Sequence, residues 1–270
     1  MAKRKRSELE ENVRYIAVLA LAVLLLRSFI AAPFFIPSES MLPRLLIGDY
    51  LIVEKWPYGY SRWSFPWGWK LLPGRVLGHT PARGDVVVFR SPEMLEDGAA
   101  APASHDVIKR VIGLPGDTIQ MRRGQLILNG QAVPKLRIAD FTVPESANYH
   151  CSRDQFRTVI AGKPFCRFDR YRETLPGGRN YEVLDWGPGA DGDDTGLFTV
   201  PAGNVFLMGD NRDDSADSRF APPMGMGYVP LDRVEGRAAV TFFSTDGSAQ
   251  WLEPWTWFSA ARPHRIGQGF

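Results

Sequence analysis

The sequence predicts a mainly β protein in which one N-terminal transmembrane helix anchors an antiparallel β-sheet domain with a smaller inserted β subdomain. An apolar segment near the N-terminus is about long enough to cross a bilayer. From residue 50 onward, short β-branched runs alternate with Gly, Pro and Asp turns, which is typical of all-β domains. With 270 residues, of which 44% are hydrophobic, the chain can bury one or two cores.

The predicted transmembrane anchor covers residues 15–32. Residues 15–26 are uninterrupted apolar, and the apolar run resumes after Arg27 and Ser28. A cleaved signal peptide is the alternative interpretation, since basic residues before an apolar core are typical of one. The run ends in bulky Phe and Ile side chains, which favours an anchor that stays attached.

The charges around this segment predict its orientation. Basic residues precede it at five positions, Lys3, Arg4, Lys5, Arg6 and Arg14. The positive-inside rule therefore assigns residues 1–14 to a cytoplasmic tail and the chain beyond the anchor to the other side of the membrane. The net charge of +2 is small for this length and gives no reason to expect nucleic-acid binding.

Two cysteines, Cys151 and Cys166, lie in the part of the chain expected outside the cytoplasm. In such a compartment a disulfide between them is more common than two free thiols. The sequence has no Cys-x-x-Cys spacing that would indicate zinc, and we expect neither a metal nor a cofactor.

Seven runs are the strand candidates: 50–54, 86–90, 107–112, 118–122, 125–128, 205–208 and 238–243. Asn129-Gly130 directly after the run 125–128 predicts that this run is the first arm of a β-hairpin.

Aromatic residues gather in the irregular segment 56–69, and Trp251, Trp255, Trp257 and Phe258 form a second group near the C-terminus. Aromatic side chains close to a membrane anchor favour a surface that enters the lipid headgroups. Ordinary burial explains them equally well, and the sequence leaves both interpretations open.

The segment after the anchor reads Pro-Ser-Glu-Ser-Met-Leu-Pro at residues 37–43. Because proline restricts its neighbours, Ser38 and Ser40 are expected on a short, non-helical stretch with both hydroxyls on one side. Three more blocks follow: Arg-Gly-Asp-Val-Val-Val-Phe at 83–89, Ile-Lys-Arg-Val-Ile-Gly-Leu-Pro-Gly-Asp at 108–117, and Gly-Asp-Asn-Arg-Asp-Asp-Ser-Ala-Asp-Ser-Arg at 209–219. As an ordered set spanning Phe34 to Arg219, they resemble the bacterial type I signal peptidases, which are membrane-anchored Ser/Lys endopeptidases.

A serine hydroxyl needs a base that accepts its proton, and none of the four histidines lies in a familiar serine-hydrolase motif. Strand alternation places Lys109 on the same face as Val107 and Val111. Burial between apolar neighbours lowers the pKa of a lysine, so that more of its neutral form is available as a general base.

The resemblance implies a role for each matching residue. Ser40 would be the nucleophile, Lys109 the general base, and Ser38 a donor to the oxyanion. Ser215 would orient the lysine, and two ion pairs would support the site, Arg110 with Asp210 and Asp217 with Arg219.

The resemblance also implies substrates with small residues at P1 and P3, of the Ala-x-Ala kind. Ile36, Met41, Leu45 and Ile108 match the S1 lining, and Phe34, Leu51 and Val88 match the S3 lining. Two residues depart from the family pattern. Asp214 stands where Asn is frequent and would hold the lysine pKa up, and Arg44 stands where a small Thr is common.

The expected organisation is a catalytic β domain over 33–121 and 203–270 and an inserted subdomain over 122–202. The implied function is removal of signal peptides from exported preproteins on the periplasmic side of the bacterial inner membrane. The expected partners are signal peptides and membrane lipid, with proximity to the secretion translocon. Three alternatives stay open: a pilus-processing Ser/Lys peptidase, a self-cleaving repressor, which the anchor disfavours, and an inactive membrane-tethered β domain that binds exported proteins.

Overall fold

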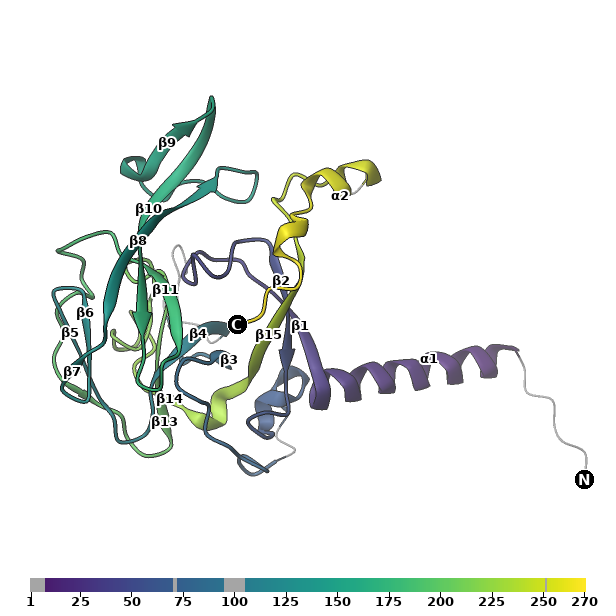
Figure 1. The fold of residues 1–270 in the computed structure, drawn as a ribbon. Coiled ribbons are helices and arrows are strands. Elements are labelled where there is room, and N and C mark those ends of the chain that lie inside the picture. Colours follow the sequence, from purple (N-terminus) through teal and green to yellow (C-terminus); the bar gives the residue numbers. More distant parts are fainter. Residues whose placement is uncertain (1–7, 70–71, 95–104, 251) are drawn as a thin grey trace, which may run out of the picture.

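The structure is a computed structural model that describes residues 8–69, 72–94, 105–250 and 252–270. Lys3, Arg4, Lys5, Arg6 and Trp251, which the sequence predictions used, lie outside the described residues. Within the described ranges, strands in three antiparallel sheets make up a β body, and one long helix projects from it (Figure 1). The predicted fold class, mainly β with an N-terminal apolar helix, is confirmed.

The long helix is α1 (Glu8–Leu25), which continues as a π-helical turn, η1 (Leu26–Ile30). Together they form a 23-residue apolar helix, Glu8–Ile30, long enough to cross a membrane. No residue of α1 is buried, and the helix extends away from the β body (Figure 1). The expected end at residue 32 is wrong, because Ala31 and Ala32 already pair with strand β2.

The largest sheet has seven strands in the order β1-β2-β15-β3-β4-β13-β14, all antiparallel to their neighbours. Its strands are β1 (Ala31–Phe35), β2 (Asp49–Glu54), β3 (Val86–Arg90), β4 (Asp106–Gly113), β13 (Asn204–Met208), β14 (Val229–Pro230) and β15 (Val234–Ser244).

Two smaller sheets lie between β4 and β13 in the sequence. One contains β8 (Lys135–Pro144), β9 (Arg157–Ile160), β10 (Lys163–Thr174) and β11 (Asn180–Leu184). The other contains β5 (Thr118–Arg122), β6 (Gln125–Leu128), β7 (Gln131–Ala132) and β12 (Phe198–Thr199). Asn129 and Gly130 connect β6 to β7 with positive φ angles of 51° and 76°, which confirms the predicted hairpin.

The segment expected as an inserted subdomain shares a core with the large sheet. Its predicted start at residue 122 is the last residue of β5, which is hydrogen-bonded to β6. Ile112 and Phe206 of the large sheet lie in one buried cluster with Leu126 and Val183 of the insertion. The division into a catalytic domain and an inserted subdomain remains a prediction, and the packing between the two parts is continuous.

Short helices complete the chain. They are η2 (Arg62–Ser64), η3 (Pro66–Gly68), η4 (Asp154–Phe156), η5 (Leu231–Arg233), α2 (Pro254–Ala260) and η6 (Pro263–Arg265). The two aromatic groups are divided between core and surface, because Tyr58 is buried whereas Trp56, Trp255 and Phe258 are exposed. Simple burial therefore does not account for the C-terminal group.

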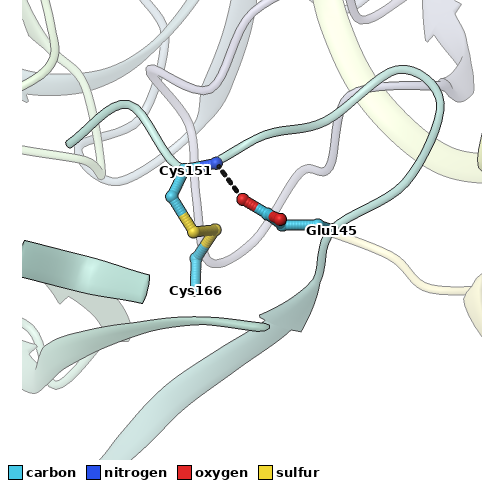
Figure 2. Close-up of side chains that lie close together, drawn as sticks. All are labelled: Glu145, Cys151 and Cys166. Atoms are coloured by element: carbon cyan, nitrogen blue, oxygen red, sulfur yellow. Dashed lines mark hydrogen bonds between the residues drawn. A yellow bond between two sulfur atoms is a disulfide. The ribbon is translucent and has the colours of Figure 1, made fainter. Parts of the chain in front are cut away.

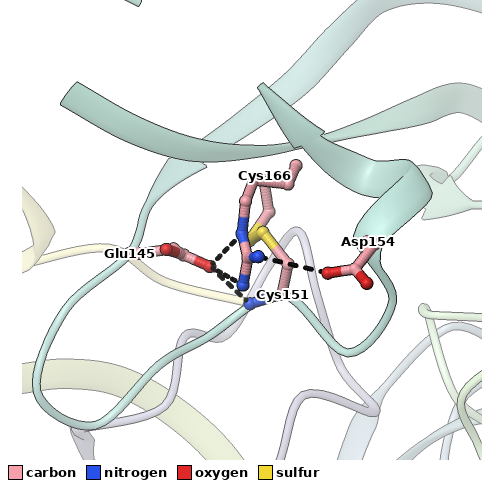
Figure 3. The surroundings of a disulfide bond; sticks show 5 residues. Glu145, Cys151, Asp154 and Cys166 are labelled. Atoms are coloured by element: carbon pink, nitrogen blue, oxygen red, sulfur yellow. Dashed lines mark hydrogen bonds and ion pairs between the residues drawn. A yellow bond between two sulfur atoms is a disulfide. The ribbon is translucent and has the colours of Figure 1, made fainter. Parts of the chain in front are cut away.

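Cys151 and Cys166 form a disulfide, with Cα atoms 5.5 Å apart (Figure 2). Glu145 accepts a hydrogen bond from the Cys151 N–H (Figure 2). Beside the disulfide, Arg157 forms ion pairs with both Glu145 and Asp154 (Figure 3). Cys166 is fully buried in one apolar cluster with Leu42 and Leu46, so the disulfide contacts the segment that follows Ser40.

Candidate active site

Ser40 and Lys109 meet at the centre of the large sheet. Lys109 lies in the middle of β4, opposite Val87 of β3, and Ser40 lies in the turn that follows β1. The Lys109 Nζ donates a hydrogen bond of 2.6 Å to the Ser40 Oγ. Both residues are buried, with exposed fractions of 8% for Ser40 and 4% for Lys109. A neutral amine at this distance can accept the hydroxyl proton directly.

Burial lowers the pKa of Lys109 from 10.5 to about 8, although Asp217, Asp210 and Asp214 act in the opposite direction. Repulsion from Arg219 acts in the same direction as burial and contributes to this value. With a pKa near 8, about one lysine in ten is neutral at pH 7, compared with about one in 3,000 at the ordinary value. The site therefore supplies a usable base near neutral pH.

The turn that carries Ser40 is held from two sides. Asn211 donates its backbone N–H to the Ser40 carbonyl (3.1 Å) and its side-chain amide to the Glu39 carbonyl (3.2 Å). Behind the turn, the buried carboxylate of Asp49 accepts bonds from the Leu46 N–H and from Arg265. Ser40 is thus fixed between the 209–219 loop and the start of β2.

Ser38 is exposed, and its Oγ lies 3.5 Å from the Ser40 Oγ. The chain forms turns from residue 39 onward and does not continue as a strand. The two hydroxyls nevertheless lie side by side, so a carbonyl attacked by Ser40 would lie within reach of Ser38. Its part as an oxyanion donor remains a prediction.

Two buried ion pairs surround the lysine. The Arg110 guanidinium binds both oxygens of Asp210, at 2.7 and 2.6 Å, and Arg219 binds both oxygens of Asp217, at 2.8 and 2.9 Å. Asp217 also accepts the Gly209 N–H (3.0 Å), which closes the 209–219 loop. Burial alone would raise the pKa of Asp217, but Arg219 and these hydrogen bonds hold it below its usual value.

Ser215 is buried in this loop, and its Oγ has no hydrogen-bond partner among the described residues. A Cβ on Gly209 would lie 2.3 Å from the Ser215 Oγ and 2.6 Å from the Ser40 carbonyl oxygen. Only glycine therefore allows the loop to approach the nucleophile this closely. The structure shows no Ser215–Lys109 hydrogen bond, so the lysine-orienting role remains a prediction.

One apolar cluster gathers all seven residues expected to line S1 and S3. Ile36, Met41, Leu45, Leu51, Val88 and Ile108 are buried in it, and Phe34 packs against it. Their assignment to subsites remains a prediction, but the cluster is contiguous and adjoins the Ser40 turn through Met41.

The two departures from the family pattern lie in different surroundings. The Arg44 guanidinium is 5.4 Å from the Phe270 ring centroid, and burial together with Arg110 and Arg265 lowers its pKa. Asp214 acts on Lys109 in the expected direction, since its charge raises the lysine pKa. Burial and the neighbouring Asp214 also raise the pKa of Glu39 to about 7.

A third buried ion pair was not expected from the sequence. Arg212 binds both oxygens of Glu173, at 2.7 and 2.6 Å, and also contacts the Tyr181 hydroxyl. Glu173 belongs to β10, so the pair attaches the 209–219 loop to the insertion. Arg212 lies within a recognised block, but Glu173 carries no sequence signal.

The family model described as signal peptidase, peptidase S26, matches residues 9–243. Signal peptidase I from Rickettsia typhi is 32% identical over 252 residues, covering 90% of this chain and 83% of the relative. Signal peptidase I from Rickettsia canadensis is 34% identical over 231 residues, covering 82% and 75%.

Among solved structures, signal peptidase I from Enterococcus faecalis matches 59% of this chain and 97% of that chain at 24% identity. Its TM-score of 0.28 is too low to bear on the fold. The family model and the Rickettsia relatives confirm the resemblance seen in the four sequence blocks, and they cover most of the chain. The chain therefore belongs to the signal peptidase family, peptidase S26, and is a serine peptidase.

Proposed function

We propose that the chain is a membrane-anchored endopeptidase that removes signal peptides from exported preproteins with a Ser40/Lys109 dyad. The observation that carries the proposal is the 2.6 Å contact between the Lys109 Nζ and the Ser40 Oγ in a buried site. The pKa of about 8 for this lysine supports its action as a base at neutral pH.

In the first step, neutral Lys109 takes the Ser40 hydroxyl proton while the Oγ attacks the scissile carbonyl carbon. The resulting oxyanion accepts a hydrogen bond from Ser38, 3.5 Å from the nucleophile in the free enzyme. Protonated Lys109 then gives its proton to the leaving amine, and the C–N bond breaks. Lys109 next takes a proton from a water molecule, whose oxygen attacks the acyl-enzyme ester. The bond between the acyl carbon and the Ser40 Oγ then breaks, and Lys109 returns the proton to that oxygen.

Specificity for small residues at P1 and P3 follows from the apolar cluster that adjoins Ser40. Its side chains, such as Met41, Leu45 and Ile108, are bulky and buried, so we expect them to leave room for only a small substrate side chain. A large side chain would displace well-packed side chains at a cost of about 1–3 kcal/mol. We therefore expect cleavage after small-x-small sequences.

The helix Glu8–Ile30 supports anchoring in the membrane, because its exposed apolar surface needs a nonaqueous environment. Lys3, Arg4, Lys5 and Arg6 precede this helix, and Arg14 lies near its N-terminal end. These five basic residues support a cytoplasmic N-terminus, with the β body on the periplasmic side of the inner membrane. Membrane lipid and the signal peptides of preproteins are then the immediate partners.

The test is cleavage of a purified preprotein with an Ala-x-Ala site by the detergent-solubilised full chain. We expect the mature protein to appear with wild type and not with Ser40→Ala or Lys109→Ala. Lys163→Ala, which removes an exposed lysine outside the site, is the matched control and should retain activity. Cleavage by the Ser40→Ala variant, or equal cleavage after a P1 Phe, would contradict the proposal.

A further inference from the structure

A cavity of about 570 Å³ adjoins the active site on the side of the 209–219 loop. It lies between residues 186–192 of the insertion and residues 212–216 of the loop, with Phe220 and Met224 as apolar walls. The polar side chains that matter for its chemistry are Arg153, Trp186, Asp191, Asp213, Asp214 and Ser215. We refer to it as the Trp186 cavity.

The Trp186 cavity and the apolar cluster share no lining residue, and both adjoin the Ser40 turn, the cavity through Ser215 and the cluster through Met41. Ser215 lines the cavity, and its Oγ and the Ser40 carbonyl approach the same face of Gly209. None of the seven residues expected to bind the P1 and P3 side chains lines it. A peptide that fills the apolar cluster up to the scissile bond would therefore continue toward this cavity with its leaving-group side.

The lining of the cavity carries an excess of negative charge. Among the lining residues, Asp191, Asp213 and Asp214 contribute three carboxylates against Arg153 and Arg212, and Arg212 is already paired with buried Glu173. Burial, together with the nearby carboxylates of Asp185 and Asp193, raises the pKa of Asp213 to about 6. At neutral pH Asp213 is therefore mainly ionised, and its charge favours a cationic ligand.

Several buried polar atoms of the lining have no hydrogen-bond partner among the described residues. They are the Ser215 Oγ and Arg212 Nε, in side chains more than nine-tenths buried, together with the Trp186 Nε1 and Asp213 Oδ1. Buried polar groups are normally paired, so this cavity is suited to a polar ligand. The unpaired N–H groups match peptide carbonyls, and the unpaired carboxylate oxygen matches an amide or ammonium group.

We propose that the Trp186 cavity binds the first residues of the mature chain, on the leaving-group side of the scissile bond, and favours a basic side chain there. The inference rests on the proposed function, since it names a further part of the substrate. The acidic rim also suits the α-ammonium group that cleavage creates, which gains its charge beside these carboxylates.

The experiment compares peptides that share one Ala-x-Ala sequence and carry Lys, Gln or Glu at each of the first three positions after the scissile bond. We expect kcat/KM for Lys to exceed that for Glu by about three- to tenfold at one or more positions. In Asp191→Asn and in Asp213→Asn the ratio should fall below about twofold. Asp232→Asn, which removes an exposed carboxylate outside the cavity, is the matched control and should keep the wild-type ratio.

A binding measurement separates this inference from the proposed function. The Ser40→Ala protein is titrated with the same labelled peptides by fluorescence anisotropy, so that affinity is measured without turnover. Tighter binding of Lys than of Glu peptides, lost in Ser40→Ala/Asp191→Asn, supports the cavity even if the wild-type protein cleaves nothing. Cleavage without any charge preference, or a preference that survives both Asp191→Asn and Asp213→Asn, overturns the inference and leaves the proposed function intact.

Discussion

Replacing Lys109 by Met should remove activity and make the protein more stable at neutral pH. Met has a similar length and fills the same space, but it carries no charge to bury. In the unfolded chain the lysine has its ordinary pKa of 10.5, whereas in the folded protein burial lowers it to about 8. The native structure therefore disfavours the charged lysine by about 3 kcal/mol.

The pH dependence follows from the same two pKa values. Between pH 8 and 10.5 the unfolded chain binds more protons than the folded chain, so the free energy of unfolding rises with pH in that window. Below pH 8 both states are protonated, and the full destabilisation is present. Lys109→Met loses this destabilisation and also about 1 kcal/mol from the hydrogen bond to Ser40, which leaves a gain of about 2 kcal/mol at pH 7.

The assay is urea unfolding of the full-length wild-type and Lys109→Met proteins in one detergent, at pH 7, 8, 9 and 10. The stability difference should be largest at pH 7 and shrink as the pH approaches 10. Lys163→Met is the matched control and should change little at any pH, since Lys163 is exposed. A Lys109→Met protein that is less stable than wild type at pH 7 would refute the buried, destabilised lysine.

Three further predictions concern the surroundings of the dyad. Ser38→Ala should lower kcat about a hundred- to a thousandfold with little change in KM or melting temperature, because it removes a donor to the oxyanion; normal turnover with early melting would assign Ser38 to the turn alone. Gly209→Ala should abolish turnover and destabilise the fold by about 1–3 kcal/mol, because the new Cβ would lie 2.3 Å from the Ser215 Oγ. An active variant with wild-type stability would show that the loop can move aside. The non-reduced, denatured protein should contain no free thiol, and two titratable thiols would exclude the disulfide. Replacing both Cys151 and Cys166 by Ser should lower the free energy of unfolding by about 3 kcal/mol, as expected for a separation of 15 residues.

Five of the seven strands of the large sheet, β2, β3, β4, β13 and β15, could be predicted because their sequences are apolar and bounded by turns. All seven strand candidates coincide with observed strands to within a few residues at each end. The strands β8 and β10 were not predicted, although they have 10 and 12 residues. In both, charged residues occupy many positions on both faces, so the alternation that indicates a half-buried strand is weak. Strand β1 was missed because its residues continue the apolar run of the helix.

The dyad could be named from the sequence through the four blocks, but its surroundings could not. Arg110 and Asp210, 100 residues apart, were paired because both lie in recognised blocks. Glu173 has no such block, and its pairing with Arg212 depends on how β10 packs against the 209–219 loop. Likewise, no sequence pattern indicates that Cys166 lies in one apolar cluster with Leu42 and Leu46, which closely follow Ser40 in the chain. Long-range packing of this kind leaves no periodic trace in a single sequence.

In the proposed membrane setting, the direct passage from helix to sheet limits how far Ser40 can lie from the bilayer. The π-helical turn ends at Ile30, strand β1 begins at the next residue, and Ser40 follows Ile30 by ten residues, a distance of at most about 35 Å even if fully extended. Because β1 is hydrogen-bonded to β2, the join cannot lengthen or swing freely. The enzyme would then cleave a peptide bond only at a set distance from the membrane. The apolar helix of the signal peptide would hold the scissile bond at that distance. A bond deeper in the membrane or farther from it would not be cleaved, whatever residues flank it.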